Sequence, residues 1–197
     1  MLNAELSKKE KVIAAAVQLF VTQGFDKVST ADISKAAGVA TGTMFHHFAS
    51  KDEIIIAAYR AAKQSFISQT IHQEAAGSVR EDLQLMWYKL VDWALSNPDQ
   101  FHYMRQFSNS PYYNKEIMAG DNTWLGLLDW WKKGISHQQI KDIPIDFLIK
   151  LFSSLLYSTI EYLMLHPAQR EEYLTHSFRL CWDMIGTPII HKKENNH

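Results

Sequence analysis

Residues 29–53 read STADISKAAGVATGTMFHHFASKDE, and this stretch decides the fold. It contains two short segments with the apolar spacing of a helix, 30–37 and 41–48. The three residues between them begin with Gly38, which is typical of a tight turn after a helix. Two helices joined by a short turn that contains glycine form a helix-turn-helix. The stretch therefore predicts this motif, with 41–48 as its second helix.

The second helix of the predicted motif has a small, polar outward face. Met44 and Phe48 lie four residues apart and predict its buried side. The second helix of a helix-turn-helix enters the major groove, where hydroxyls and imidazoles bind base edges or phosphates and glycine lets the backbone approach closely. The alternative for the adjacent histidines is an ordinary half-exposed surface pair. We expect DNA contacts from Thr41, Gly42, Thr43, His46 and His47.

Helices are also predicted on both sides of the motif. Over 8–23, apolar residues recur at the spacing of one helical face, and Gly24 ends the segment. Serine followed three residues later by an acid, as in Ser29 with Asp32 and Ser50 with Glu53, marks a helix start. The second pair predicts a helix over 51–74.

The rest of the chain predicts long amphipathic helices. They are expected over 79–96, 99–107, 122–137, 145–165 and 168–185, with prolines between them, where proline is tolerated. With 8 Gly and 5 Pro in 197 residues, the composition fits an all-α chain. We expect a helix-turn-helix domain over 1–50 and a larger helical domain over 51–188, with 51–75 as the connecting helix. Residues 189–197 are expected to form a flexible tail.

The stretch from Lys9 to about Tyr59 resembles the N-terminal domain of the tetracycline-repressor (TetR) family of bacterial regulators. The match is carried by 15–20, Gly24-Phe25, Ser29-Thr30, Ile33-Ser34, 36–39, 42–45, His47-Phe48 and 50–53. The resemblance implies an all-α fold: an N-terminal three-helix helix-turn-helix domain and a C-terminal helical bundle for ligand binding and dimerisation. The DNA-binding residues that it implies are Thr30, Thr41, Gly42, Thr43, Phe45, His46, His47 and Lys51.

Two of these positions invite comment. The family most often has Tyr at position 45, so Phe45 lacks the hydroxyl that would reach a phosphate. Lys51 is the family's phosphate-binding lysine. It falls in the first turn of a helix, where the helix dipole disfavours a cation and a phosphate would reverse that effect. The alternative is a solvated lysine.

The resemblance also implies that the last two helices form a dimer interface. The segment 145–165 has a wider apolar stripe than one buried face needs, and its serines allow close helix approach. A two-fold homodimer would bury this excess, whereas the alternative is a helix buried centrally in one chain. The expected interface residues are Leu151, Leu155, Leu156, Phe178 and Trp182.

Aromatic residues concentrate after residue 60, where all six Trp lie. Ligand cavities are usually apolar and aromatic with a few polar anchors. For any single residue, packing in the core is the alternative. Asp92, Asp129 and Glu161 are candidate counter-charges for a cationic effector, and the alternative is that each is simply solvated. The candidate pocket residues are Trp87, Trp93, Phe101, Phe107, Tyr112, Tyr113, Trp124, Trp130, Trp131, Phe152 and Tyr157.

Other classes of protein lack their sequence signals. There is no nucleotide-binding glycine motif, no serine-hydrolase motif and no metal-ligand spacing among the nine His, so we expect neither an enzyme nor a cofactor or metal. Cys181 lies among apolar residues and is expected to be buried and inert. No signal segment or membrane span is expected, which favours a cytoplasmic location. The net charge of −1 contributes nothing to a DNA-binding prediction, which depends on the motif.

These observations predict a ligand-responsive transcriptional regulator, in particular a repressor. It would bind palindromic operator DNA as a homodimer and be released by a small, largely apolar or aromatic effector. The alternative is a helical protein-binding or scaffold module without an effector, which would not need a polar outward face on so short a helix.

Overall fold

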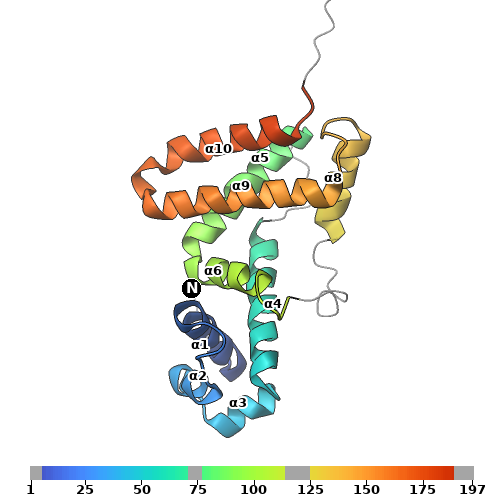
Figure 1. Cartoon of the computed structure of the whole chain (residues 1–197). Helices are drawn as coiled ribbons and strands as arrows, with labels where there is room; N and C mark the ends of the chain where they lie inside the picture. Colours follow the sequence, from blue (N-terminus) through green and yellow to red (C-terminus); the bar gives the residue numbers. More distant parts are fainter. Residues whose placement is uncertain (1–5, 71–76, 114–124, 189–197) are drawn as a thin grey trace, which may run out of the picture. The chain divides into compact units, whose positions relative to one another are not determined.

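The computed structural model describes residues 6–70, 77–113 and 125–188. Within these ranges the chain is helical, with no strand beyond an isolated bridge between Ile140 and Gly186 (Figure 1). The all-α prediction is confirmed, and within the described residues the helix bounds agree with those expected to within a few residues. The helix end expected at 74, the helix start expected at 122 and the tail expected over 189–197 lie outside the described residues. The helices are α1 Lys8–Gln23, α2 Thr30–Ala37, α3 Thr41–His47, α4 Lys51–Thr70, α5 Val79–Ser96, α6 Pro98–Ser108, α8 Leu125–Ser136, α9 Ile145–Leu165 and α10 Arg170–Ile185.

The chain divides into two compact units. The first comprises Met1–Gln69 and Ser96–Asn122, and the second comprises Thr70–Leu95 and Thr123–His197. The domain boundary expected at residue 50 marks the end of the sequence motif. The compact unit that contains the motif extends further and includes α4 and α6. Its core explains why.

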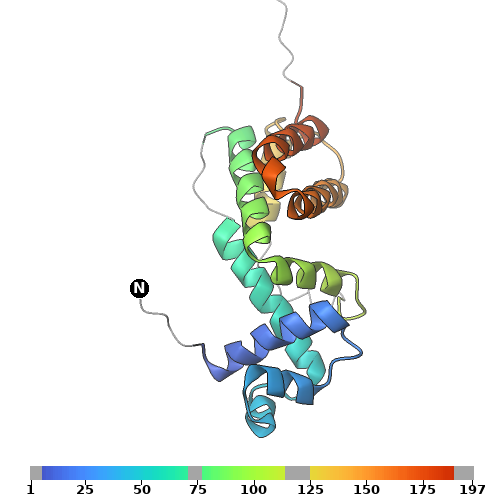
Figure 2. The ribbon, with the colours of Figure 1, turned by 90° about the vertical axis from the view of Figure 1, so that its left-hand side faces the viewer.

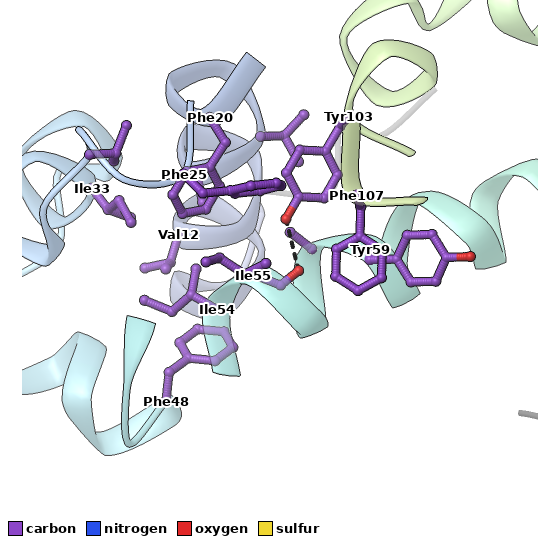
Figure 3. Close-up of a cluster of buried hydrophobic side chains, with 14 of the residues drawn as sticks. Val12, Phe20, Phe25, Ile33, Phe48, Ile54, Ile55, Tyr59, Tyr103 and Phe107 are labelled. Atoms are coloured by element: carbon purple, nitrogen blue, oxygen red, sulfur yellow. Dashed lines mark hydrogen bonds between the residues drawn. The ribbon is translucent and has the colours of Figure 1, made fainter. Parts of the chain in front are cut away.

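The core of the first unit is shared by all of its helices (Figure 3). Phe20 of α1, Ile33 of α2 and Met44 of α3 are each fully buried. Ile54 and Ile55 of α4 are fully buried against them. Because α2 has eight residues and α3 seven, neither is long enough to be stable alone, and both depend on this shared core.

Helix α6 joins this core through aromatic contacts (Figure 3). The ring of Tyr103 stacks on Phe20 at 6.1 Å, and its hydroxyl donates a hydrogen bond of 2.8 Å to the carbonyl of Ile55. Phe107 stacks on Tyr59 of α4 at 4.1 Å. Helix α6 is therefore fixed to both α1 and α4, although more than 40 residues separate Tyr103 from Ile55 in sequence.

The second unit contains α5, α8, α9 and α10. Helices α9 and α10 lie side by side and run in opposite directions, joined by a short 3-10 turn at Pro167–Gln169 (Figures 1 and 2). The indole N–H of Trp87 in α5 donates to the hydroxyl of Ser177 in α10 at 3.2 Å. Arg170 at the start of α10 forms an ion pair with Asp92 of α5. These contacts fix α5 to the last helix.

The bond between Tyr103 and Ile55 gives a stability prediction. Tyr103→Phe should lower the free energy of unfolding by about 1–3 kcal/mol, because the buried Ile55 carbonyl would lose its partner. Burial raises the pKa of Tyr103, so the hydroxyl stays protonated across the neutral range. Chemical denaturation monitored by circular dichroism measures the change. Tyr113→Phe, at an exposed position, is the control and should match the wild type.

Candidate nucleic-acid interface

The turn between α2 and α3 has the backbone that a helix-turn-helix requires. Gly38 adopts a left-handed conformation with φ of 63°, which a side chain would disfavour. The N–H of Val39 then donates to the carbonyl of Ser34 at 3.0 Å, and this bond closes the end of α2. Val39 itself is buried. The backbone can therefore reverse within three residues and begin α3 at Thr41.

The start of α2 is fixed by the capping box expected from the sequence. The hydroxyl of Ser29 accepts the N–H of Asp32 at 3.1 Å, and the Asp32 carboxylate accepts the N–H of Ser29 at 3.0 Å. The hydroxyl of Ser29, and then its N–H, hold the pKa of Asp32 below its usual range. A charged carboxylate thus stabilises the helix start at neutral pH. Thr30 is the first residue of this helix.

Helix α3 buries one side and exposes the other. Met44 is fully buried, and Phe48 at the end of the helix is 3% exposed. Thr43 is half-buried, and the remaining expected contact residues of the helix are exposed: Thr41, Gly42, Phe45, His46 and His47. Their placement fits a face that is free to meet another molecule.

Aromatic and imidazole rings dominate the C-terminal half of the exposed face. Phe45 is 44% exposed. The rings of His46 and His47 lie 5.6 Å apart in an edge-to-face arrangement. Both occupy the last turn of α3. Their ring nitrogens can donate or accept hydrogen bonds at the exposed face.

The hydroxyl of Thr41 has an assignable role. It lies 3.1 Å from the hydroxyl of Ser34, which in turn donates to the carbonyl of Ala31 at 3.0 Å. Since Ser34 has only one hydroxyl proton, Thr41 is the donor in their bond. The oxygen of Thr41 keeps its capacity to accept a hydrogen bond, while its proton links α3 to α2.

Lys51, the expected phosphate-binding lysine, contacts the protein itself. Its ammonium donates to the carbonyl of Phe25 at 3.0 Å and to that of Val28 at 3.3 Å. Both carbonyls belong to the connection between α1 and α2. No local sequence pattern marks this contact, because the partners lie 23 and 26 residues away. Phosphate binding by Lys51 stays a prediction.

Comparison with known proteins agrees with this geometry. Residues 12–58, which span most of α1 through the first part of α4, match the family model described as bacterial regulatory proteins, tetR family. The helix-turn-helix segment of this chain is that of the TetR family.

Solved structures in the TetR family extend the likeness to the whole fold. A protein from Shewanella sp. PV-4 ascribed to the family is 28% identical, with a TM-score of 0.83 over 93% of this chain and 100% of that one. A TetR family transcription regulator from Marinobacter aquaeolei VT8 is 23% identical, with a TM-score of 0.80 over 92% of this chain and 96% of that one.

Curated relatives match over a shorter range. The HTH-type transcriptional regulator YvdT of Bacillus subtilis is 36% identical over 34% of this chain and 32% of its own length. The nucleoid occlusion factor SlmA of Marinobacter nauticus is 30% identical over 50% of this chain and 51% of its own length. The match thus spans between about a third and a half of these relatives.

The aromatic residues expected to line a TetR-type pocket fall into two groups. One group belongs to the first unit, where Phe107 and Tyr112 pack in or against the core of the helix-turn-helix. Burial, and then the carboxylate of Asp52, raise the pKa of Tyr112. Phe101, which is buried, and Tyr113, which is exposed, belong to the same unit. These four residues therefore lie with the DNA-binding motif.

The other group belongs to the second unit. Phe152 meets Trp87 at 5.4 Å and Trp131 at 5.6 Å, both edge to face, and Trp131 meets Trp130 at 5.4 Å. Trp93 is buried in the same unit, and Tyr157 of α9 is half-buried. Trp124 lies outside the described residues.

The candidate counter-charges have partners within the described residues. Asp92 is paired with Arg170, and Asp129 lies 3.9 Å from Lys132. Glu161 also has an interaction partner. Asp92 is thus already paired with an arginine, and a role of these carboxylates as counter-charges for a cation stays a prediction. The thiol of Cys181 is buried, and burial raises its pKa to about 12, in agreement with an inert cysteine.

The expected dimer residues divide by burial. Leu156 and Phe178 are 5% and 2% exposed and lie in the core of the second unit, whereas Leu151, Leu155 and Trp182 are half-buried. Burial within the protomer leaves the first two little surface for a partner.

A groove of about 540 Å³ lies between α9 and α10. Among its lining residues, Leu155 was expected at an interface, whereas Leu180 was not, although it is 60% exposed. The sequence could have indicated Leu180, because it is an apolar residue that falls outside the spacing of the buried residues of α10. The other lining residues are Ser158, Thr159, Tyr162, Tyr173, His176, Ser177 and Arg179.

Helix α9 has more apolar surface than its own unit covers. Among the described helices it alone is long and apolar enough to cross a membrane by length and composition, yet only 33% of its most apolar window is buried. Phe147 and Leu165 at its two ends are 52% and 78% exposed. Because α9 belongs to a helical bundle of the TetR fold, contact with another protein surface explains its exposed apolar residues more simply than contact with a lipid bilayer does.

Proposed function

We propose that this chain is a ligand-responsive transcriptional regulator, in particular a repressor, that binds palindromic operator DNA as a homodimer. The observation that carries the proposal is the exposed polar face of α3, held on a buried core by Met44 and Phe48. A helix of seven residues with such a face has little use within the protein itself. The match of the helix-turn-helix segment to the TetR family supports a regulator over an enzyme.

We assign operator recognition to residues of both α2 and α3. Thr43, His46 and His47 are proposed to meet base edges or phosphates from α3, and Gly42 would allow the backbone to approach. Thr30 at the start of α2 is suited to a phosphate, whereas the oxygen of Thr41, whose proton is used within the protein, is suited to a donor such as an amino group on a base edge. Phe45, without a hydroxyl, is left with apolar contact only.

Dimerisation is assigned to the groove and the apolar surface of α9 and α10. Exposed leucines at 165 and 180 and half-buried Leu155 would be covered by the same face of a second copy, as in an isologous two-fold interface. Two short recognition helices would then read the two halves of a palindrome.

The effector is proposed to be a small, largely apolar or aromatic compound. The support is the aromatic group of the second unit, in which Trp87, Trp131 and Phe152 meet edge to face. Rings of this kind bind apolar ligands by contact and stacking. The alternative, a protein-binding scaffold without an effector, would show no DNA mobility shift with the promoter region of its own gene and no response to small molecules.

The first prediction concerns recognition. Thr43→Ala and His47→Ala should each weaken operator binding by about 1–3 kcal/mol and relax preference at one base position, since each removes a contact to the operator. Binding is measured by a mobility shift over a series of salt concentrations. Lys35→Ala, at an exposed position on α2, controls for a change of helix surface. Wild-type affinity in both variants would show that α3 does not recognise the operator.

The second prediction concerns assembly. Leu180→Glu should convert a dimer to a monomer, because it places a charge in the apolar groove while the exposed position keeps the protomer folded. Operator affinity should collapse with it. Sedimentation and a mobility shift measure the two effects. Leu85→Glu, at a position on α5 that is 41% exposed, is the matched control and should stay dimeric. A monomeric wild type that binds a palindrome tightly would contradict the proposal.

The third prediction concerns the effector. An apolar aromatic compound that binds should quench tryptophan fluorescence and lower operator affinity about 5- to 150-fold, the range of coupling energies of about 1–3 kcal/mol. Linkage is reciprocal, so operator DNA must weaken binding of the compound by the same factor. Titrations with and without operator measure both. Equal affinity of the compound in the two titrations would mean that it does not control DNA binding.

A further inference from the structure

We infer that Lys51 is a positioning residue for the DNA-reading helices: its ammonium holds the connection between α1 and α2 against the start of α4. The inference deepens the proposed function, and its DNA readout rests on that function. It assigns Lys51 an action through the protein backbone, where the family resemblance assigns it a direct phosphate contact.

The geometry places two carbonyls on one ammonium. The carbonyls of Phe25 and Val28 accept from the Lys51 ammonium at 3.0 and 3.3 Å. The side chains of Phe25 and Val28 are 8% and 1% exposed, so this connection is packed into the core of the first unit (Figure 3). A charged donor makes a stronger hydrogen bond than a neutral one. The lysine therefore contacts a fixed part of the structure and not a mobile surface loop.

The contact between Lys51 and Phe25 closes a loop of the chain that contains both α2 and α3. The chain leaves Phe25, forms α2, the turn and α3, and returns to Lys51 after 26 residues. Both short helices thus lie between the two ends of one cross-link. The loss of the ammonium would open this loop and let the pair of helices move more freely on the core.

The contact also sets the direction of α2. Val28 directly precedes Ser29, whose side chain caps the helix, and Thr30 is the first residue of α2. A fixed Val28 carbonyl orients the peptide plane that leads into this cap. The start of α2, which the proposed function directs at a phosphate, therefore takes its orientation from Lys51.

The ammonium of Lys51 lies at the end of α4 where the helix dipole disfavours positive charge. Lys51 is the first residue of α4, and Asp52 and Glu53 follow in the same turn. A cation in the first turn is disfavoured by the dipole. The two carbonyl oxygens supply a local reason for a lysine at this position in the free protein, without any phosphate.

The experiment compares Lys51→Met, Lys51→Arg and Lys27→Met by hydrogen exchange of the full chain without DNA. Methionine keeps the aliphatic length and removes the ammonium. We expect amides of α2 and α3 to exchange about tenfold faster in Lys51→Met, with those of α1 and α6 unchanged. Arginine, which also has N–H donors, should restore much of the protection. Lys27→Met removes an exposed lysine from the same connection and should exchange like the wild type.

Operator binding supplies the second readout. If Lys51 acts by position, Lys51→Met should weaken binding with an unchanged dependence on salt, and Lys51→Arg should recover it. Wild-type exchange combined with a salt slope smaller by about 0.9 would make Lys51 a direct phosphate ligand and overturn the inference. A uniform rise in exchange over the whole first unit would also overturn it, as general destabilisation. If the wild type binds no operator, the proposed function fails, and the exchange data still decide whether Lys51 holds the reader.

Discussion

The structure depends on the burial of Met44 and Phe48 beneath a helix too short to stand alone. A helix of seven residues gains too few internal hydrogen bonds to offset its nucleation, so packing must hold it. Both side chains enter a core that α1, α2 and α4 share. One side of α3 is thereby fixed, and its opposite side is left free for polar and imidazole groups. The same burial that makes the helix stable makes it available as a reader.

The sequence predicted those features that depend on neighbours in the chain. The box of Ser29 and Asp32, the left-handed Gly38 and the buried spacing of Met44 and Phe48 are local signals, and each is present. The role of Tyr103 was not predictable, because its partner Ile55 lies 48 residues away and no local pattern marks a hydroxyl that will meet a distant carbonyl. The contact of Lys51 with the carbonyls of Phe25 and Val28 was not predictable for the same reason. The residue type and helix position of Lys51 suggested an anion, whereas distant backbone carbonyls satisfy the same chemical requirement.

Composition was a poorer guide in the second half of the chain. An aromatic ring in a core and one in a pocket are equally apolar, so only tertiary contacts distinguish them. Phe107 illustrates this, since it stacks on Tyr59 within the unit of the helix-turn-helix. Leu156 shows the same limit for the dimer interface. A wide apolar stripe indicates that a helix has much hydrophobic surface, but it does not indicate which residues of the stripe contact a partner and which, like Leu156, are buried within the chain. The exposed Leu180 on the neighbouring helix is the better candidate because its own unit leaves it uncovered.

The division into units constrains how any effector can act. The proposed dimer surface and the aromatic group belong to one unit, and the reader belongs to the other. The chain crosses between them at 69/70, 95/96 and 122/123. The second crossing lies at the end of α5, which Asn97 alone separates from α6. Helix α6 carries Tyr103, which bonds to Ile55 of α4, and α4 begins at Lys51. Helix α6, which begins just after the second crossing, is thus part of the core that holds α2 and α3.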